Sequence, residues 1–272
     1  MKTKIFKHIF FILFLILLVA CSTKKDTFLA RNSHALSTRD NILYNGQIAL
    51  DKGVISINSS TKDNFWKRLP IERMQIIDDS SPEGVSKNPD FEKAEEKATK
   101  AIQKHSMYIE KKKKNYQIDE AYLLLGKARY YDQRFFPALE AFNYILYKYP
   151  TSSNINPAKI WREKTNMRLG NDAQVLKNIE KLLKEKKLKP QVVADANALL
   201  AESFLNLEEK DSAIAKLKIA EKNTKINFEK TRYRFILGQL YQELGIRDTA
   251  LSYYQGVIDM NRKADREYLI KN

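Results

Sequence analysis

Residues that could carry out chemistry are few in this sequence and lie far apart. The three histidines are His8, His34 and His105, and no two of them have the spacing of ligands in a metal-binding motif. Adjacent carboxylates such as Asp78 and Asp79 lie in polar segments, and neighbours on a chain do not face one substrate. The sequence has neither a nucleophile elbow nor a glycine loop for phosphate. We therefore predict no enzyme activity, no catalytic residue, no metal site and no cofactor.

The two tryptophans, Trp66 and Trp161, have rings that could stack on sugars. Both lie near apolar residues in the sequence, which is more typical of core positions. We interpret both rings as core and keep glycan binding as an alternative.

Cys21 is the only cysteine of the chain, and it follows an export-like leader. The leader has a basic head and an apolar run at 9–19 that is too short for a typical transmembrane helix. Residues 18–21 read Leu-Val-Ala-Cys and resemble the lipobox of bacterial lipoproteins, in which the cysteine is lipidated. The pattern predicts a signal peptide at 1–20 and lipid attachment at Cys21. Because one acyl chain gives only marginal binding, the several chains of a lipoprotein would provide a stable anchor.

The formal net charge of +15 is compatible with nucleic-acid binding when it is considered alone. Removal of the leader takes away three lysines, which leaves 15 − 3 = +12 on an exported protein. Outside the cytoplasm, acidic protein surfaces or anionic envelope polymers are better partners for this charge than nucleic acid. We therefore predict no nucleic-acid partner.

The composition favours helices, because glycine and proline are scarce while Lys, Glu, Leu and Ala are abundant. Apolar spacing predicts a helix around 42–50, and turn-forming residues predict a linker at 78–90. Asp90 is expected to cap a following helix that carries the lysines at 111–114 at its C-terminal end. Those lysines are either a patch for anionic partners or a solvated helix end. The segment at 63–74, "DNFWKRLPIERM", is expected to be a structured loop or a helix end that packs on the next element.

An internal repeat organises the rest of the chain. The stretch from Asp119 to Pro150 combines large residues with small ones at helical spacing, and a similar pattern returns near Thr231. Weaker copies start near Asn156 and Ala194, so the period is about 37 residues, close to that of the tetratricopeptide repeat. The copy near Asn156 has Arg162 where leucine is usual, which predicts an atypical first helix. The pattern resembles the tetratricopeptide repeat and predicts an all-α solenoid over 90–272, after a tether, helical segment and linker at 21–89.

Two sets of residues follow from the repeat pattern. Small residues let paired helices cross closely, and large residues fill the space around the crossing. The residues expected to pack in this way are Tyr122, Leu125, Gly126, Ala138, Phe142, Pro150, Leu200, Ala201, Phe204, Ala213, Leu237, Gly238, Tyr241, Ala250 and Tyr254. The first-helix residues left over would face a concave groove for a protein partner, and they are Leu123, Lys127, Tyr130, Tyr131, Glu202, Asn206, Gln239, Gln242 and Glu243.

Three stretches carry a more specific resemblance: "LYNGQIALDKG", "NFWKRLPIE" and the run from Lys100 to Pro150. They are similar to the PorW/SprE lipoproteins of Bacteroidota, which belong to the type IX secretion system and gliding motility apparatus. The resemblance implies a non-enzymatic scaffold, lipid-anchored in the outer membrane and facing the periplasm. Its implied partners are the outer-membrane translocon and periplasmic ring components. Members of that family are longer, which is consistent with the chain being a fragment.

Two other classes of lipoprotein share some of these features. A barrel-assembly lipoprotein similar to BamD would have the lipid anchor, the size and the helical repeats. A glycan-capture lipoprotein of the SusD type would use exposed aromatic residues. The scarcity of tryptophan and the absence of an acidic cluster after Cys21 disfavour the second.

Overall fold

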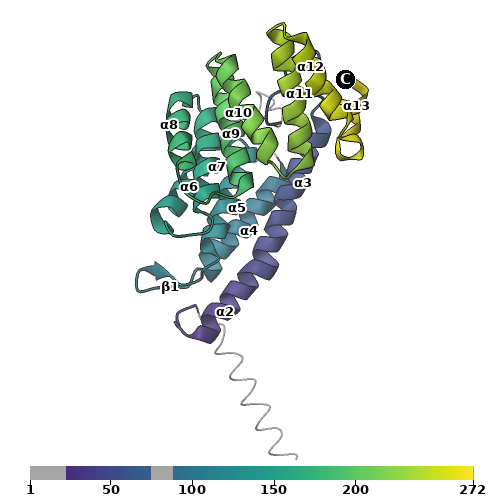
Figure 1. Cartoon of the computed structure of the whole chain (residues 1–272). Coiled ribbons are helices and arrows are strands. Elements are labelled where there is room, and N and C mark those ends of the chain that lie inside the picture. Colours follow the sequence, from purple (N-terminus) through teal and green to yellow (C-terminus); the bar gives the residue numbers. More distant parts are fainter. Residues whose placement is uncertain (1–22, 75–87, 272) are drawn as a thin grey trace, which may run out of the picture. The chain divides into compact units, whose positions relative to one another are not determined.

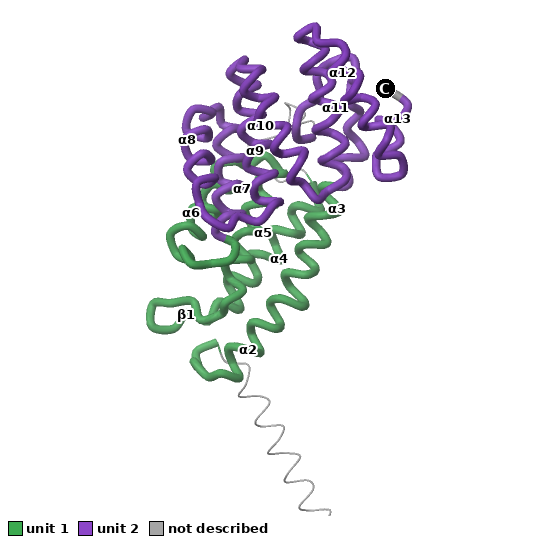
Figure 2. Tube along the Cα trace, viewed as in Figure 1, with its two compact units in different colours: residues 1–54, 81–154 green, residues 55–80, 155–272 purple. Residues whose placement is uncertain are grey.

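The protein divides into two compact units, which are coloured separately in Figure 2. The computed structural model describes residues 23–74 and 88–271. Unit 1 comprises residues 1–54 and 81–154, and unit 2 comprises residues 55–80 and 155–272. The predicted signal peptide, Cys21 and most of the predicted linker lie outside the described residues. The units cut across the predicted ranges 21–89 and 90–272, because residues 55–74 pack with helices much later in the chain.

The described part of unit 1 is mainly helical (Figure 1). Its helices are α2 (Phe28–Ser37), the π-helix η1 (Thr38–Leu43), the first part of α3 (Tyr44–Ser60), α4 (Pro89–His105), α5 (Ile118–Tyr131) and α6 (Phe135–Lys148). The Thr27 side chain caps α2 by accepting a hydrogen bond from the Ala30 N–H at 3.2 Å. The helix predicted around 42–50 is confirmed, because η1 and α3 cover these residues within a longer helical run.

Close helix crossings in unit 1 depend on glycine. A Cβ atom on Gly126 would lie 2.4 Å from the Phe142 ring, so α5 and α6 cross at a distance that only glycine permits. A Cβ on Gly53 would likewise lie 2.3 Å from the Phe91 ring of α4. Phe91 and Phe142 are both fully buried. The cost of a helical glycine, about 1 kcal/mol, is thus offset by burial of two large rings.

Two predictions about α4 are wrong. Its N-cap is Asn88 rather than Asp90, since the Asn88 side chain accepts a hydrogen bond from the Asp90 N–H at 2.9 Å. The helix also ends at His105, before the lysine run. The lysines at 111–114 lie in and beside an antiparallel hairpin of β1 (Tyr108–Ile109) and β2 (Lys112–Lys113). Glu110 and Lys111 form its turn with positive φ angles, a conformation that a helix does not allow.

Unit 2 contains successive helix pairs (Figure 1). The pairs are α7 (Ile155–Arg168) with α8 (Asp172–Leu183), α9 (Pro190–Asn206) with α10 (Lys210–Asn223), and α11 (Asn227–Glu243) with α12 (Arg247–Ile258), followed by the 3-10 turn η2 (Asn261–Lys263) and α13 (Arg266–Lys271). With α5 and α6, these pairs begin within four residues of the predicted starts near 119, 156, 194 and 231. The prediction of an all-α fold built from repeated helix pairs is confirmed.

Helix α7, the first helix of the repeat that starts near Asn156, is atypical as predicted. Glu163, where glycine is usual, has a buried side chain that pairs with Arg162 at 2.6 Å. It also accepts hydrogen bonds from Asn166 and Asn178, each at 3.0 Å. A buried carboxylate is tolerated here because it is paired and hydrogen-bonded.

Candidate protein-binding groove

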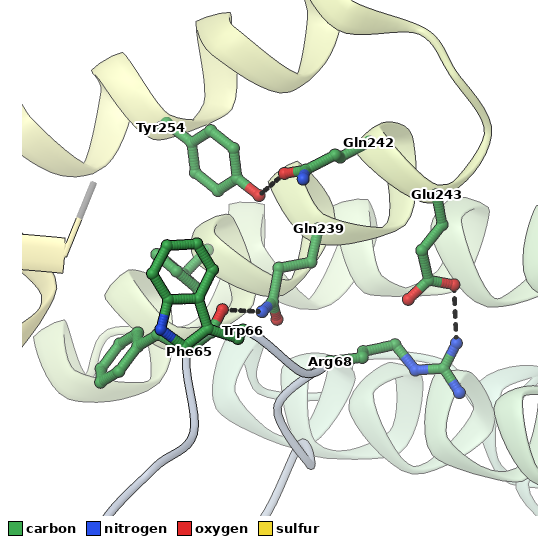
Figure 3. A pocket seen from close by; sticks show the side chains of 8 residues that line it. Phe65, Trp66, Arg68, Gln239, Gln242, Glu243 and Tyr254 are labelled. Atoms are coloured by element: carbon green, nitrogen blue, oxygen red, sulfur yellow. Dashed lines mark hydrogen bonds and ion pairs between the residues drawn. The ribbon is translucent and has the colours of Figure 1, made fainter.

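An irregular segment of the chain, residues 63–73, packs against the first helices of the repeats in unit 2. We call it the strap. The Gln239 side chain of α11 holds its backbone: it accepts from the Leu69 N–H at 2.9 Å and donates to the Lys67 carbonyl at 2.8 Å and the Phe65 carbonyl at 3.2 Å. Figure 3 shows the contact between Gln239 and the strap. One amide thus satisfies three backbone groups of a segment that has no strand partner.

Apolar side chains of the strap complete the core of unit 2. Leu69 and Ile71 belong to one buried cluster with Ala198 of α9 and Ile236 of α11. Phe65 packs against this cluster, with its ring edge-on to Phe235 at 5.2 Å between centroids. The strap is therefore part of the folded core, and burial of Leu69 and Ile71 contributes on the order of 2 kcal/mol each.

A buried charge network fastens the N-terminal end of the strap. Asp63 accepts from Arg232 of α11 at 2.7 Å and also pairs with Arg73. Burial acts to raise the pKa of Asp63, but hydrogen bonds from Arg232 and Arg73 outweigh it and lower the pKa. Arg232 also donates to the Pro70 carbonyl at 2.8 Å and to the Tyr268 hydroxyl at 2.7 Å. Every charge in this network has a partner, as buried charges require.

A second network fastens the strap at Glu72. Its carboxylate pairs with Lys164 at 2.6 Å and with Arg168 at 3.0 Å, both on α7. Arg168 also pairs with Glu202 of α9 at 3.2 Å. Burial raises the pKa of Glu202 despite this cation. Ion pairs thus connect the strap directly to α7 and, through Arg168, to α9.

A cavity of about 340 Å³ opens beside the strap, lined by Phe65, Trp66, Arg68, Phe235, Gln239, Gln242, Glu243 and Tyr254 (Figure 3). Its rim is polar: Glu243 pairs with Arg68 at 3.0 Å, and the Tyr254 hydroxyl donates to Gln242 at 2.8 Å. Trp66 is 96% exposed. The expectation that Trp66 is a core residue is therefore wrong: Leu69 takes the buried position of this segment, and Phe65 is partly buried against the core. An exposed tryptophan beside an aromatic-lined cavity is a surface suited to a binding partner.

The structure places the predicted groove residues in three different situations. Gln239, Gln242 and Glu243 all line the cavity, and Gln239 is also hydrogen-bonded to the strap. Glu202 pairs with Arg168, and Asn206 donates to Asp172 at 3.1 Å. In the last two repeats, then, the surface predicted to meet a partner is partly covered by the chain itself.

The groove residues predicted in α5 need correction. Leu123 and Tyr130 are buried, Tyr130 completely, so the expectation that they face a partner is wrong. Tyr130 packs edge-on against Phe135, the first residue of α6, with ring centroids 5.8 Å apart. Lys127 and Tyr131 are half-buried, and both make contacts within the protein.

Most residues predicted for repeat packing lie at helix crossings. A Cβ on Gly238 would lie 2.5 Å from the Tyr254 ring, which repeats the relationship of Gly126 and Phe142. Buried members of the predicted set are Leu125, Ala138, Phe142, Leu200, Ala201, Ala213, Leu237 and Ala250. Half-buried ones are Tyr122, Phe204, Tyr241 and Tyr254. Pro150 is exposed, so its predicted packing role is wrong, and it follows the end of α6 instead.

Histidines that are far apart in sequence do meet in unit 1. The Nδ1 atoms of His34 and His105 lie 3.1 Å apart. Burial lowers the pKa of His105, and the nearby positive charge of His34, Lys100 and Lys104 lowers it further. Among residues 23–74 and 88–271, no group of three or more His, Cys, Asp or Glu side chains could hold a metal ion.

The fold is that of a helical-repeat protein, built from successive helix pairs. The sequence profile of the tetratricopeptide repeat matches residues 120–152, which cover α5 and α6. Residues 120–152 thus match a tetratricopeptide repeat, and repeats of this kind generally mediate contacts between proteins. No curated protein matches the sequence. Within the described residues, no helix is both long and apolar enough to cross a bilayer.

Proposed function

We propose that the protein is a non-enzymatic scaffold and that a protein partner binds over the strap at the cavity beside Trp66. The observation that carries this proposal is the 96% exposure of Trp66 next to a cavity lined by Phe235 and Tyr254. Aromatic side chains of this kind supply much of the free energy of binding at protein interfaces. The partner binds on the strap, because the backbone of the strap already occupies Gln239.

The setting of this scaffold is proposed from the sequence. Lipidation at Cys21, supported by the lipobox-like motif at 18–21, would attach it to the outer membrane on the periplasmic side. The resemblance to PorW/SprE lipoproteins supports a place in the type IX secretion and gliding motility apparatus. The proposed partners are then the outer-membrane translocon and the periplasmic ring components.

Affinity purification of the lipidated protein from cell envelopes tests the proposal. Translocon or ring components should be recovered with the unaltered chain and reduced at least tenfold with Trp66→Ala. Tyr147→Ala is the matched control, because Tyr147 is 77% exposed on α6 and is not among the residues lining this cavity. It should recover the same partners as the unaltered chain.

Three results would contradict parts of the proposal. Equal recovery of partners with Trp66→Ala would show that the partner does not bind at this cavity. Failure to recover any translocon or ring component would remove the assignment to this machinery. A general loss of outer-membrane proteins on depletion would favour a barrel-assembly role, and specific capture of polysaccharides would favour a glycan-binding one.

A further inference from the structure

The start of α2 and the β1–β2 hairpin lie at one end of unit 1 (Figure 1). These segments and the loop after the hairpin carry exposed aromatic, apolar and basic side chains. The apolar and aromatic members are exposed by 74% at Phe28, 62% at Leu29, 66% at Tyr108 and 60% at Tyr116. The basic members are Lys111 and Lys112, both exposed. We call these six residues the end patch.

Two polar contacts join the loop after the hairpin to α2 and its neighbourhood. Lys114, next to the end of β2, pairs with Asp26 at 2.8 Å, two residues before α2 begins. Asn115 donates to the Thr38 hydroxyl at 2.9 Å, which joins the same loop to η1. The two halves of the end patch are therefore fixed side by side within unit 1.

Lys111 and Lys112 of the hairpin are exposed, whereas Lys113 is half-buried. Lys113 is used internally, because its ammonium group lies 4.6 Å from the Tyr122 ring centroid and donates to the Tyr122 hydroxyl at 2.8 Å. Lys111 lies in the turn and Lys112 is paired across the strands with Ile109. Within the described residues, neither Lys111 nor Lys112 takes part in an ion pair. Two positive charges at the tip are thus available to an external anion.

We propose that the end patch binds the surface of a lipid bilayer that carries anionic headgroups. Phe28, Leu29 and the two tyrosines would enter the interface between headgroups and acyl chains, where amphipathic rings are favoured. Lys111 and Lys112 would contact anionic headgroups. This inference rests on the proposed function for the identity of the membrane and for the lipid at Cys21. The contact of the end patch with the membrane would be additional to that lipid.

The chain length supports a bilayer as the occupant. Asp26 lies five positions after Cys21, a span of at most roughly 17 Å when the chain is fully extended. A lipid on Cys21 would therefore keep the end patch close to the membrane. Two weak membrane contacts that act together bind far more tightly than either alone, because the second is intramolecular.

Vesicle sedimentation tests the inference without the lipid. The chain is prepared without its leader and with Cys21→Ser, so that it cannot be acylated. It is then mixed with vesicles of phosphatidylcholine alone or of phosphatidylcholine with phosphatidylglycerol. We expect binding to the anionic vesicles at least tenfold tighter than to the neutral ones, and weakening of this binding as salt is added.

Double variants distinguish an effect of the end patch from an effect of the net charge of the protein. Lys111→Glu with Lys112→Glu should weaken binding to anionic vesicles at least tenfold. The control, Lys186→Glu with Lys187→Glu, makes the same charge change at two exposed lysines in the turn before α9 and should change binding less than twofold. Phe28→Ser with Leu29→Ser should weaken binding also at high salt. Thermal unfolding of each variant should match that of the parent chain.

Several outcomes would overturn the inference. They are equal binding to neutral and anionic vesicles, equal loss with both lysine pairs, or no sedimentation with vesicles. None of them bears on the recovery of protein partners through Trp66, so failure of the end patch and failure of the scaffold proposal remain distinguishable.

Discussion

Gln239 binds the strap at Leu69, 170 positions earlier in the chain: the Leu69 N–H donates to the Gln239 side chain at 2.9 Å. The same amide donates to the carbonyls of Phe65 and Lys67. A first-helix residue that could meet a partner instead satisfies the protein's own backbone. The first helices of the last two repeats therefore pack against a segment that precedes all the repeats.

Gln239→Glu should destabilise unit 2. A carboxylate would still accept from Leu69 but would face the carbonyls of Phe65 and Lys67 without a proton to donate. We expect a loss of about 1–3 kcal/mol in the free energy of unfolding, measured by urea titration. Gln242→Glu is the control, because its side chain is exposed and acts as an acceptor for Tyr254. A loss of the same size in both variants would contradict the role given to Gln239.

Asp63→Asn should be one of the most damaging single substitutions in the strap. It would leave Arg232 and Arg73 buried with one compensating charge fewer, at a cost of about 3–5 kcal/mol. The exposed pair of Asp40 with Arg39 offers the control, since Asp40→Asn should have no measurable effect. Chemical denaturation of both variants makes the comparison. Near-identical midpoints would show that the network is dispensable.

Acid should also weaken the network at Asp63. Because the folded-state pKa of Asp63 is lowered, the folded chain holds its proton less tightly than the unfolded chain does. The resulting stabilisation is present above the unfolded value of about 3.9 and is lost as the pH falls through the folded value. Subtracting the pH profile of Asp63→Asn from that of the parent chain should show this loss below about pH 4. A flat difference would contradict it.

Gly126→Ala should destabilise unit 1, because the new methyl group would overlap the buried Phe142 ring. We expect about 1–3 kcal/mol, with partial rescue by Phe142→Leu. Gly256→Ala is a matched control on α12, where the nearest atom to a new Cβ is 3.9 Å away. That change should be neutral or stabilising by up to about 1 kcal/mol, because alanine is the better helix former. Thermal unfolding should rank the variants in this order.

The pairing of His34 with His105 predicts a second pH dependence. The lowered pKa of His105 means that the unfolded chain, with a value of about 6.5, takes up the proton first as the pH falls. The free energy of unfolding should therefore decrease as the pH falls below about 6.5, until the folded His105 is itself protonated. His105→Gln should remove this part of the profile. An unchanged profile in that variant would assign the effect to other groups.

The repeats could be predicted because their pattern is local. Gly126 and Phe142 lie on adjacent helices of one pair, and the small and large residues around them recur along the sequence. The strap could not be predicted in the same way, since its partners Gln239 and Arg232 lie more than 160 positions away. Periodicity reports which face of a helix is apolar, but it does not report which distant segment covers that face.

The remaining errors have local causes. The lysines at 111–114 are compatible with a helix by propensity, yet the positive φ angles of Glu110 and Lys111 turn the chain into a hairpin. Tyr130 was expected to be left over for a partner, but the turn between α5 and α6 folds Phe135 against it. Trp66 lies in a turn between Phe65 and Leu69, which pack on the core, so its exposure depends on the local path of the backbone. The partner roles of Gln242 and Glu243 remain predictions.

Hydrogen exchange of the strap amides tests the central claim most directly. If the strap packs against α11 as described, the Leu69 amide should exchange as slowly as the core amides of α11. The substitution Gln239→Ala should then increase the exchange rate of the Leu69 amide more than the exchange rates of the α7 amides. If the Leu69 amide of the unaltered protein exchanges at the rate of an unstructured peptide, the strap does not pack against α11. The binding surface at Trp66 would then not exist in the form described.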